Sequence, residues 1–560
     1  MANGAEILVA RRLIRPRRGN ALLLLYPLLG LGLALFVAYP LALLLAQALQ
    51  ADGRLSAATL AGLLADPSTR TVLGNTLVLG LTVAVLGTTG ATVYAYAMTR
   101  VAMPGKGFFH FVALLPAISP PILMALGLIL LYGRRGLITH GLLGLNTTAI
   151  YGYWGLTAAQ VLGYFPFAYL LLLNLFRGLD ASLEEAAWTM GAHPGKILTT
   201  VSLPLLVPGI ASAILLLFGY SFADLGNPLL LGGDYPVLAA QIYLSIIGMY
   251  DVPRGAALAV ILLVPAMLLF FAHKRLAERT AFASVGGRAS TRHPQVRHPA
   301  VRAGALVFCA GLCLLILLQY ATILGGALTR LFGINHTFTL RHFASALTAS
   351  RAALVDTIGL AAVASAVSGV GGLLIAYFVA RRRVPGRTAM DFVASLPLAI
   401  PGTVVGLAFA IAFNRAPLLL AGTAAIIIAA FAVRTVPYGI RSGVAALAQL
   451  DRSLDEASTT MGATAFQTLW RVILPLVRPA VLAGMIFTFT RSVTSLSAVI
   501  FVVSPHWRLV TPTILSQMDR GDVGEAAALS VLLILVVLLV IHGIPRLLGR
   551  DWRDALGNDQ

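Results

Sequence analysis

LEEAAWTMGAHPGKILTTVSLPLLVP, residues 183–208, is matched later in the chain by LDEASTTMGATAFQTLWRVILPLVRP, residues 454–479. Each matching pair lies 271 positions apart (456 − 185 for the glutamates). Similarity at one fixed offset indicates a duplicated unit, so we expect two related halves. The residues that recur are Glu185, Ala186, Gly191, Pro204 and Pro208, which correspond to Glu456, Ala457, Gly462, Pro475 and Pro479.

Each copy predicts a short amphipathic helix. Its first turn is acidic, as the helix dipole favours, and Gly191 or Gly462 follows where a helix would end. A second segment then closes at a Leu-Pro pair. The helix is too short and too charged to cross a bilayer, yet long apolar segments flank it on both sides. We therefore expect it to lie in a loop on one membrane face.

The composition is that of an integral membrane protein. Of 560 residues, 58% are hydrophobic and 11% are charged, whereas about 25% are charged in average chains. The formal charge of +19 is compatible with a nucleic-acid partner, but the basic residues lie between apolar segments, which predicts membrane topology and no nucleic acid. Cys309 and Cys313 lie one helical turn apart in an apolar run, so we expect them to be packing residues.

Twelve apolar runs are long enough to cross about 30 Å of hydrocarbon, at roughly 20 residues each. The first run extends beyond the roughly 7–15 apolar residues of a signal peptide, which predicts a retained span. The sequence therefore predicts an all-α integral membrane protein with about 12 transmembrane helices in two pseudo-symmetric six-helix halves. The predicted spans lie near residues 21–48, 72–99, 108–132, 150–175, 204–222, 255–272, 303–325, 352–380, 389–413, 417–437, 476–499 and 525–545.

Twelve crossings place both termini and both repeated loops on one face of the membrane. Lys and Arg are more frequent in the connections on that face, for example at Arg100, Lys106 and Arg381, than in the connections on the other face. The positive-inside rule therefore predicts that both termini and both loops are cytoplasmic.

The repeat also divides the chain. We expect a first half at 1–272 with its loop at 181–208, a basic cytoplasmic linker at 273–302, and a second half at 303–560 with its loop at 452–479. A change of offset from 281 to 271 predicts about ten extra residues in the first half, in the outer loop around 132–151. The positions that recur at an offset of 281 include Arg100, Pro116 and Pro120, which match Arg381, Pro397 and Pro401.

Glu-Ala-Ala, a following Gly and then Leu-Pro resemble the cytoplasmic coupling loop of binding-protein-dependent ABC importers. The second copy departs from the pattern at Ser458, a small residue in place of alanine. The resemblance implies the type I ABC importer permease fold in the bacterial inner membrane. It also implies that each loop docks on a subunit of a cytoplasmic ABC ATPase dimer. The residues assigned to this coupling are Glu184, Glu185, Ala186, Gly191, Asp455, Glu456, Ala457 and Gly462.

The same resemblance implies that a periplasmic solute-binding protein delivers the solute. ATP and Mg²⁺ would be bound by the ATPase, because this chain has no phosphate-binding loop: GAHPGK at 191–196 has the wrong glycine spacing. We therefore expect no enzyme activity, no cofactor and no resident metal in this chain. An ion-coupled secondary transporter, which also commonly has twelve spans in two halves, is the alternative, but it has no reason to keep two acidic loop helices in register.

Charged residues inside membrane spans are costly and point by default to a function. Asp224 is expected near the outer end of the fifth span and Arg491 within the eleventh. Asp224 could equally cap a helix or lie at an interface, and Arg491 could pair with a neighbouring carboxylate. Arg434 is expected close enough to a span end to reach solvent.

Residues 223–241 and 495–505 resemble one subgroup of these permeases, the fused ferric-iron type and its 2-aminoethylphosphonate-transporting relatives. Ferric iron, our first expectation, would favour hard oxygen ligands, and Tyr243 adds one to the outer loop. An anionic phosphonate or another small anion would prefer Arg491 and backbone donors, and the sequence leaves both open. The residues assigned to the substrate pathway are Asp224, Asp234, Tyr235, Arg491 and Ser495.

Overall fold

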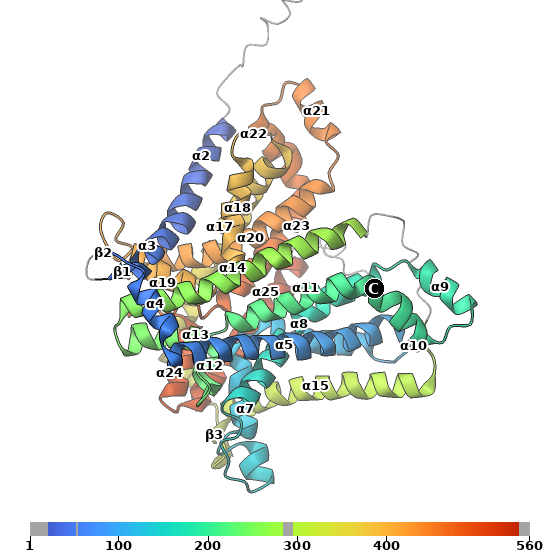
Figure 1. Ribbon diagram of the computed structural model, residues 1–560, viewed down its shortest axis with the longest axis vertical. Coiled ribbons are helices and arrows are strands. Elements are labelled where there is room, and N and C mark those ends of the chain that lie inside the picture. Colours follow the sequence, from blue (N-terminus) through green and yellow to red (C-terminus); the bar gives the residue numbers. More distant parts are fainter. Residues whose placement is uncertain (1–20, 52–53, 284–294, 383, 548–560) are drawn as a thin grey trace, which may run out of the picture.

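The computed structural model describes residues 21–51, 54–283, 295–382 and 384–547. This part of the chain is almost entirely helical (Figure 1). It contains 11 helices that are long and apolar enough to cross a membrane, or 12 if a bent helix pair counts as one span. The all-α membrane fold predicted from the sequence is confirmed.

The first half begins with a helical segment, two short strands then form an antiparallel hairpin, and the other helices of this half follow. Its elements are α2 (Ala21–Leu33), η1 (Ala34–Ala38), α3 (Tyr39–Ala48), β1 (Gln50–Ala51), β2 (Arg54–Leu55), α4 (Ala58–Ala65), α5 (Pro67–Arg100), α6 (Lys106–Ile118), α7 (Ile122–Tyr132), η2 (Leu137–Leu142), α8 (Tyr153–Arg177), α9 (Ala181–Thr189), α10 (Pro194–Ile197), η3 (Leu198–Ser202), α11 (Leu203–Phe222), α12 (Gly226–Leu231), α13 (Leu238–Tyr243), η4 (Leu244–Gly248) and α14 (Val252–Ala283), where η marks a π-helical turn.

The second half repeats this order with a second antiparallel hairpin. Its elements are α15 (Pro299–Leu328), β3 (Thr329–Leu331), β4 (Asn335–Phe338), α16 (Arg341–Thr348), α17 (Arg351–Arg381), α18 (Arg387–Ala399), α19 (Gly402–Ala412), α20 (Ala424–Ala448), α21 (Ser453–Thr460), α22 (Ala465–Thr468), η5 (Leu469–Ile473), α23 (Leu474–Val493), α24 (Val510–Asp519) and α25 (Val523–Leu547).

Equivalent helices form the core of each half. In the first half α5 packs against α8 and α11, and in the second half α17 packs against α20 and α23. The crossing of α17 and α20 is close because Gly372 and Gly439 face each other, and a Cβ on Gly372 would lie 2.6 Å from the Gly439 carbonyl carbon. The first helices of each half cross over, since α3 packs against α19 and α15 packs against α6 and α7.

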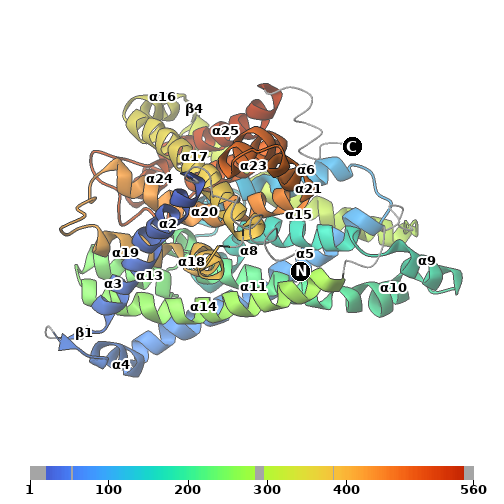
Figure 2. The same cartoon turned by 90° about the horizontal axis from the view of Figure 1, so that it is seen from above.

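The two repeated loops lie on the same side of the molecule. In Figure 1, α9 lies at the right and α21 at the top, and in both views they lie away from β1, α13 and α24, which are at the left (Figures 1 and 2). The loops are also separated from each other, with α9 beyond the ends of α8 and α11, and α21 near α22 and α23. A common side for both loops agrees with the even number of crossings between them.

Two of the predicted spans are broken in the structure. The span expected at 108–132 ends as α6 at Ile118 and restarts as α7 at Ile122, and the span expected at 389–413 is the pair α18 and α19, bent by 111°. Pro120, Pro121 and Pro401 lie at these breaks and supply no backbone N–H, so the helices cannot continue through them. Apolar composition alone does not show such a break.

Three further boundaries differ. The span expected at 417–437 lies later, as α20, because a loop occupies residues 413–423. The Leu-Pro pairs do not close a segment, since Pro204 and Pro475 lie in the first turn of α11 and α23, which follow a π-helical turn without a break. Helix α14 continues to Ala283, into the segment assigned to the linker, and residues 284–294 lie outside the described residues.

The extra residues of the first half are found where they were expected. The loop between α7 and α8 covers residues 133–152 and includes η2, whereas the loop between α19 and α20 covers only residues 413–423.

Candidate functional site

The two repeated loops present matching exposed surfaces. Helix α9 begins at Asp180, whose carboxylate accepts the Ser182 N–H (2.9 Å), and ends before Gly191, which has φ +81°. Helix α21 ends in the same way before Gly462, with φ +78°. A positive φ favours glycine, which explains why this residue is repeated. The predicted coupling residues that are exposed in these loops are Glu185, Ala186, Gly191, Glu456, Ala457 and Gly462.

Apolar side chains surround these exposed acids. Met190 is 82% exposed and Met461 is 87% exposed, directly before the two glycines, and Trp188 and Trp470 are also exposed. Methionine adapts to irregular partner surfaces, and clustered exposed apolar side chains mark interaction sites. Each loop therefore has the chemistry of a docking surface.

Glu184 has a different environment from Glu185. It is buried, and its carboxylate accepts hydrogen bonds from Arg100 Nε (2.8 Å) and Ser202 Oγ (2.8 Å). Arg100 Nη2 also donates to the carbonyl of Phe176 (2.8 Å). These contacts join α9 to the ends of α5 and α8 and to η3. Glu184 is among the predicted coupling residues, but its side chain faces the protein.

Asp455 occupies the equivalent position in the second half. Arg381 Nη1 lies 3.1 Å from its carboxylate, and Arg381 Nη2 donates to the carbonyls of Leu447 and Leu450. The Asp455 side chain is 27% exposed, whereas that of Glu184 is 5% exposed. In the sequence, Arg100 and Arg381 stand out as charges on one membrane face and as a pair that recurs at an offset of 281. Their recurrence at a fixed offset was the signal that each pairs with the acidic residue of its own loop.

The last described part of the segment assigned to the linker packs beside the first loop. Val296 N donates to the Arg100 carbonyl (2.8 Å), and Ala102 N donates to the Val296 carbonyl (3.1 Å). Gln295 Nε2 donates to the carbonyl of Thr99 (2.9 Å). Val296 is buried and lies in the same small cavity as Arg100 and Glu184. The end of the linker segment therefore packs beside the ion pair of the first half.

A polar chamber of about 100 Å³ lies between the two halves, and it brings together three of the five residues assigned to the pathway. Asp224, Arg491 and Ser495 all line it. Arg491 and Ser495 lie 271 positions after Tyr220 and Asp224, which line the same chamber. The halves thus supply equivalent positions with different chemistry: the first half contributes a phenol and a carboxylate, and the second a guanidinium and a hydroxyl.

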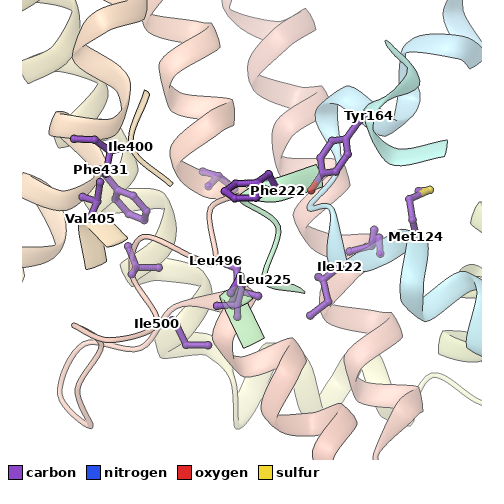
Figure 3. Close-up of a cluster of buried hydrophobic side chains, with 14 of the residues drawn as sticks. Ile122, Met124, Tyr164, Phe222, Leu225, Ile400, Val405, Phe431, Leu496 and Ile500 are labelled. Atoms are coloured by element: carbon purple, nitrogen blue, oxygen red, sulfur yellow. The ribbon is translucent and has the colours of Figure 1, made fainter. Parts of the chain in front are cut away.

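Apolar residues close the chamber on one side. Figure 3 shows Leu225 of the first half beside Leu496 of the second half, with Ile122 and Ile500 near them. A Cβ on Gly226 would lie 3.2 Å from Leu496 and 3.3 Å from Ile122, so the two halves meet closely here. We interpret this contact as a seal between the chamber and the outer loops.

Asp224 is held by amide donors. Its Oδ2 accepts hydrogen bonds from Gln160 Nε2 (2.8 Å) and Asn227 Nδ2 (2.7 Å), and Ser221 donates in turn to Gln160. Asp224 therefore joins α8, α11 and α12 in addition to lining the chamber. Both sequence interpretations of Asp224, an interface residue and a pathway residue, are compatible with this position.

Arg491 lies against aromatic rings. Its guanidinium carbon is 5.4 Å from the centroid of Phe167 and 5.9 Å from that of Tyr220. A guanidinium over a ring face is stabilised by the quadrupole of the ring. Among the described residues, no carboxylate forms an ion pair with Arg491. These residues therefore do not support the interpretation that Arg491 pairs with a neighbouring carboxylate.

Arg434 was expected near a span end, and this prediction is wrong. It lies ten residues into α20, and its Nη1 donates to the carbonyls of Pro397 (2.8 Å) and Ile400 (2.7 Å). These carbonyls are free because the helix breaks between α18 and α19. Arg434 therefore binds the break and also lines the chamber. The span was predicted at 417–437, but α20 begins at Ala424, so Arg434 lies deeper in the helix than the sequence indicates.

A larger cavity of about 530 Å³ adjoins the chamber, and Tyr220, Ala223, Arg434 and Tyr438 line both. It extends along residues 266–274 of α14 and the middle of α20, toward the side of the repeated loops. Its other polar residues are His273, Lys274 and Arg441, and no Asp or Glu is among the described residues that line it.

The remaining pathway residues lie elsewhere. Asp234 and Tyr235 line a different cavity with Arg134 and Tyr151. Tyr235 donates to the carbonyl of Asn75 (3.0 Å), and burial raises the pKa of its phenol, which disfavours the tyrosinate form that a metal would prefer. The structure thus separates Asp234 and Tyr235 from Asp224.

Tyr243 is also placed apart from the chamber, since its ring packs against Phe501 (6.1 Å between centroids). Within the described part of the chain, no three His, Cys, Asp or Glu side chains gather as metal ligands would.

Two repeated helical halves, a polar chamber between them and paired docking loops on one side define a membrane transport permease. The chain belongs to the family of binding-protein-dependent transport system inner membrane components, whose family model matches residues 104–282 and again residues 372–554. The double match agrees with the duplication found in the sequence. This is a family of permeases and not of enzymes, and its fold is the type I ABC importer permease fold.

Several relatives are known by name. The chain is 31% identical to the ferric transport system permease protein FbpB of Actinobacillus pleuropneumoniae over 480 residues, which are 84% of this chain and 70% of that protein. It is 32% identical to the sulfate transport system permease protein CysT of Escherichia coli over 220 residues, 37% of this chain and 79% of that protein. It is 28% identical to a Salmonella paratyphi A permease named for 2-aminoethylphosphonate transport, over 38% of this chain and 81% of that protein.

Proposed function

We propose that this chain is the membrane-spanning subunit of an ATP-driven importer, with a solute path between its two halves. Residues 1–272 and 303–560 would form the halves, and residues 273–302 would connect them. A periplasmic binding protein would deliver the solute to the outer loops, and a cytoplasmic ATPase dimer carrying ATP and Mg²⁺ would bind the repeated loops. Both termini would be cytoplasmic, as the distribution of Lys and Arg favours.

The observation that carries this proposal is the arrangement of the two loops. Each exposes a glutamate, Glu185 or Glu456, beside an exposed methionine, and each is joined by an internal ion pair to its own bundle. Movement of a docked ATPase subunit would therefore be transmitted to α5 or α17 without bending of the loop. Alternating access of this kind is a rigid-body change between two packed states.

The solute that the relatives favour is ferric iron. The relative named for ferric transport matches both halves of this chain, whereas the relatives named for sulfate and 2-aminoethylphosphonate match about the length of one half. A small anion such as 2-aminoethylphosphonate is the second candidate, and the two arginines of the chamber favour it.

The proposal is tested by reconstituting the purified chain with its candidate ATPase in lipid and measuring ATP hydrolysis. Binding proteins loaded with ferric iron, with 2-aminoethylphosphonate or with sulfate are added one at a time. Stimulation by one loaded protein supports the proposal and identifies the solute. Solute uptake that continues without ATP and stops when the proton gradient is removed would instead indicate an ion-coupled carrier.

A further inference from the structure

We propose that the chamber between the halves is an oxyanion-binding site within the membrane, formed by Arg491 and Arg434. The solute would then cross either as a free oxyanion or as a metal ion that carries an oxyanion ligand. This inference deepens the proposed function, because it specifies the chemical form in which the solute passes.

The charge of the chamber is the first argument. Two guanidiniums, of Arg434 and Arg491, and one carboxylate, of Asp224, line it, which leaves a formal charge of +1. The carboxylate already accepts two amide hydrogen bonds and so is occupied as an acceptor. Positive charge inside a membrane protein is costly unless something compensates it. A bound anion would supply that compensation.

The available donors are the second argument. Arg434 donates its hydrogen bonds through Nη1 alone, and among the described residues no acceptor lies within hydrogen-bond distance of its Nε or Nη2. Ser492 also lines the chamber, is 1% exposed, and its Oγ has no hydrogen-bond partner in the described part of the chain. Guanidinium forks match the geometry of oxyanions, and a buried hydroxyl without a partner is unusual.

The direction of the path is the third argument. Arg434 lines both the chamber and the larger cavity, and the larger cavity adds Lys274 and Arg441 with no carboxylate among its described lining residues. An anion leaving Arg491 would meet a succession of cationic groups on the side of the repeated loops. A bare trivalent cation would be repelled along the same course, and the described residues offer it no cluster of carboxylate ligands.

The size of the chamber is consistent with a small ligand. Its volume of about 100 Å³ has room for several water molecules, since one water needs about 10–15 Å³ of such space. The arginines belong to the second half only, since the positions equivalent to Arg434 and Arg491 in the first half, at an offset of 271, are Gly163 and Tyr220. The second half therefore supplies both guanidiniums, whereas both halves supply aromatic rings to the chamber, Tyr164 and Tyr220 from the first and Phe431 and Tyr438 from the second.

The test measures binding to the full chain in lipid nanodiscs without any binding protein. The probes are inorganic phosphate, 2-aminoethylphosphonate, ferric ion with phosphate, and ferric ion with a chelator that has no oxyanion, followed by ³¹P line broadening or radiolabel. We expect the oxyanion probes to bind, with at least tenfold weaker binding in Arg491→Gln and in Arg434→Gln, and partial recovery in Arg491→Lys. Arg520→Gln, the same charge change at an exposed outer position, is the control and should bind like the wild type.

Binding of phosphate or phosphonate alone would identify a free oxyanion as the ligand. Binding only when ferric ion is added would identify the metal-borne form. The inference is overturned if the oxyanion probes do not bind, if both glutamine variants bind them like the wild type, or if ferric ion binds equally without an oxyanion. ATPase stimulation by a loaded binding protein is measured on the same preparations, so a failure of the oxyanion site is distinguished from a failure of the importer function.

Discussion

Arg100 Nε lies 2.8 Å from Glu184 Oε2, and this ion pair joins the last turn of α5 to the first turn of α9. Both side chains are almost completely buried, and Ser202 completes the coordination of the carboxylate. Removing one partner of a buried pair leaves the other charge uncompensated. The first loop is therefore fixed in orientation by the same acidic pair that exposes Glu185 on its other face.

We expect Glu184→Gln to uncouple transport more strongly than Asp455→Asn. Breaking a buried ion pair costs about 3–5 kcal/mol, whereas Asp455 is partly exposed and solvent compensates for part of its loss. The measurement is solute taken up per ATP hydrolysed in proteoliposomes. Equal losses in the two variants would contradict the difference in burial as the cause.

Glu185→Gln and Glu456→Gln should weaken ATPase binding without destabilising the loops, unlike Glu184→Gln and Asp455→Asn. Their side chains are exposed, so stability should change by less than about 0.5 kcal/mol, while affinity for the ATPase should fall. Thermal unfolding of the chain and surface binding of the ATPase separate the two effects. A variant that unfolds earlier but binds the ATPase normally would show that the glutamate has a structural role instead.

The glycines that end the loop helices should tolerate asparagine better than valine. Gly191 and Gly462 have φ of +81° and +78°, and a left-handed conformation costs a non-glycine residue about 1–2 kcal/mol, least for Asn. We expect Gly191→Val to reduce coupled ATP hydrolysis severely and Gly191→Asn mildly, with the same order at Gly462. If the Asn and Val variants hydrolyse ATP equally well, backbone conformation is not the reason that glycine recurs in both loops.

Val296 should matter for the first loop alone. Its side chain is buried beside Arg100 and Glu184, so Val296→Asp places a carboxylate where it competes with Glu184 for the arginine. We expect uptake to fall at least fivefold in Val296→Asp and to remain near normal in Val296→Ala. Normal uptake by the aspartate variant would show that this contact of the linker segment does not support coupling.

Asp66 makes a pH-dependent contribution to the folding stability of the chain, and it lies outside the transport path. It caps α5, and hydrogen bonds from the Thr69 side chain and the Ser68 backbone lower the pKa of its carboxyl. Because the folded pKa is below the unfolded value, its stabilisation is present above about pH 4 and is lost as the pH falls through the folded pKa. Asp66→Asn should therefore show a smaller fall in melting temperature between pH 5 and pH 3 than the wild type. An identical fall would contradict this.

The sequence was sufficient for the architecture because the two main signals are local. Apolar length predicts a span, and repetition at a fixed offset predicts the halves and the paired loops. Prolines at 120, 121 and 401 break two spans. A break is stable only where the backbone carbonyls it leaves free find other donors, as the Pro397 and Ile400 carbonyls find Arg434. Such long-range partners are not visible in a hydropathy pattern.

The candidate site was predictable in part. Asp224, Arg491 and Ser495 do meet in one chamber, because a charge in a span is costly and is placed where helices of both halves converge. Glu184 and Glu185 are adjacent in sequence and similar in chemistry, and only the turn of α9 decides which one faces the protein. Asp234 and Tyr235 carry the oxygen ligands that ferric iron would favour, but they line a separate outer cavity.

The distance between the two loops tests the central claim most directly. Met190→Cys and Met461→Cys, in a background with Cys309 and Cys313 replaced by serine, place spin labels on exposed positions next to the two glycines. Pulsed electron paramagnetic resonance spectroscopy then measures the distance between the labels in nanodiscs with the ATPase bound. We predict a shorter distance after trapping with ATP and vanadate than in the nucleotide-free complex, as the ATPase dimer closes and carries α9 and α21 together. An unchanged distance in a complex that hydrolyses ATP would contradict the account.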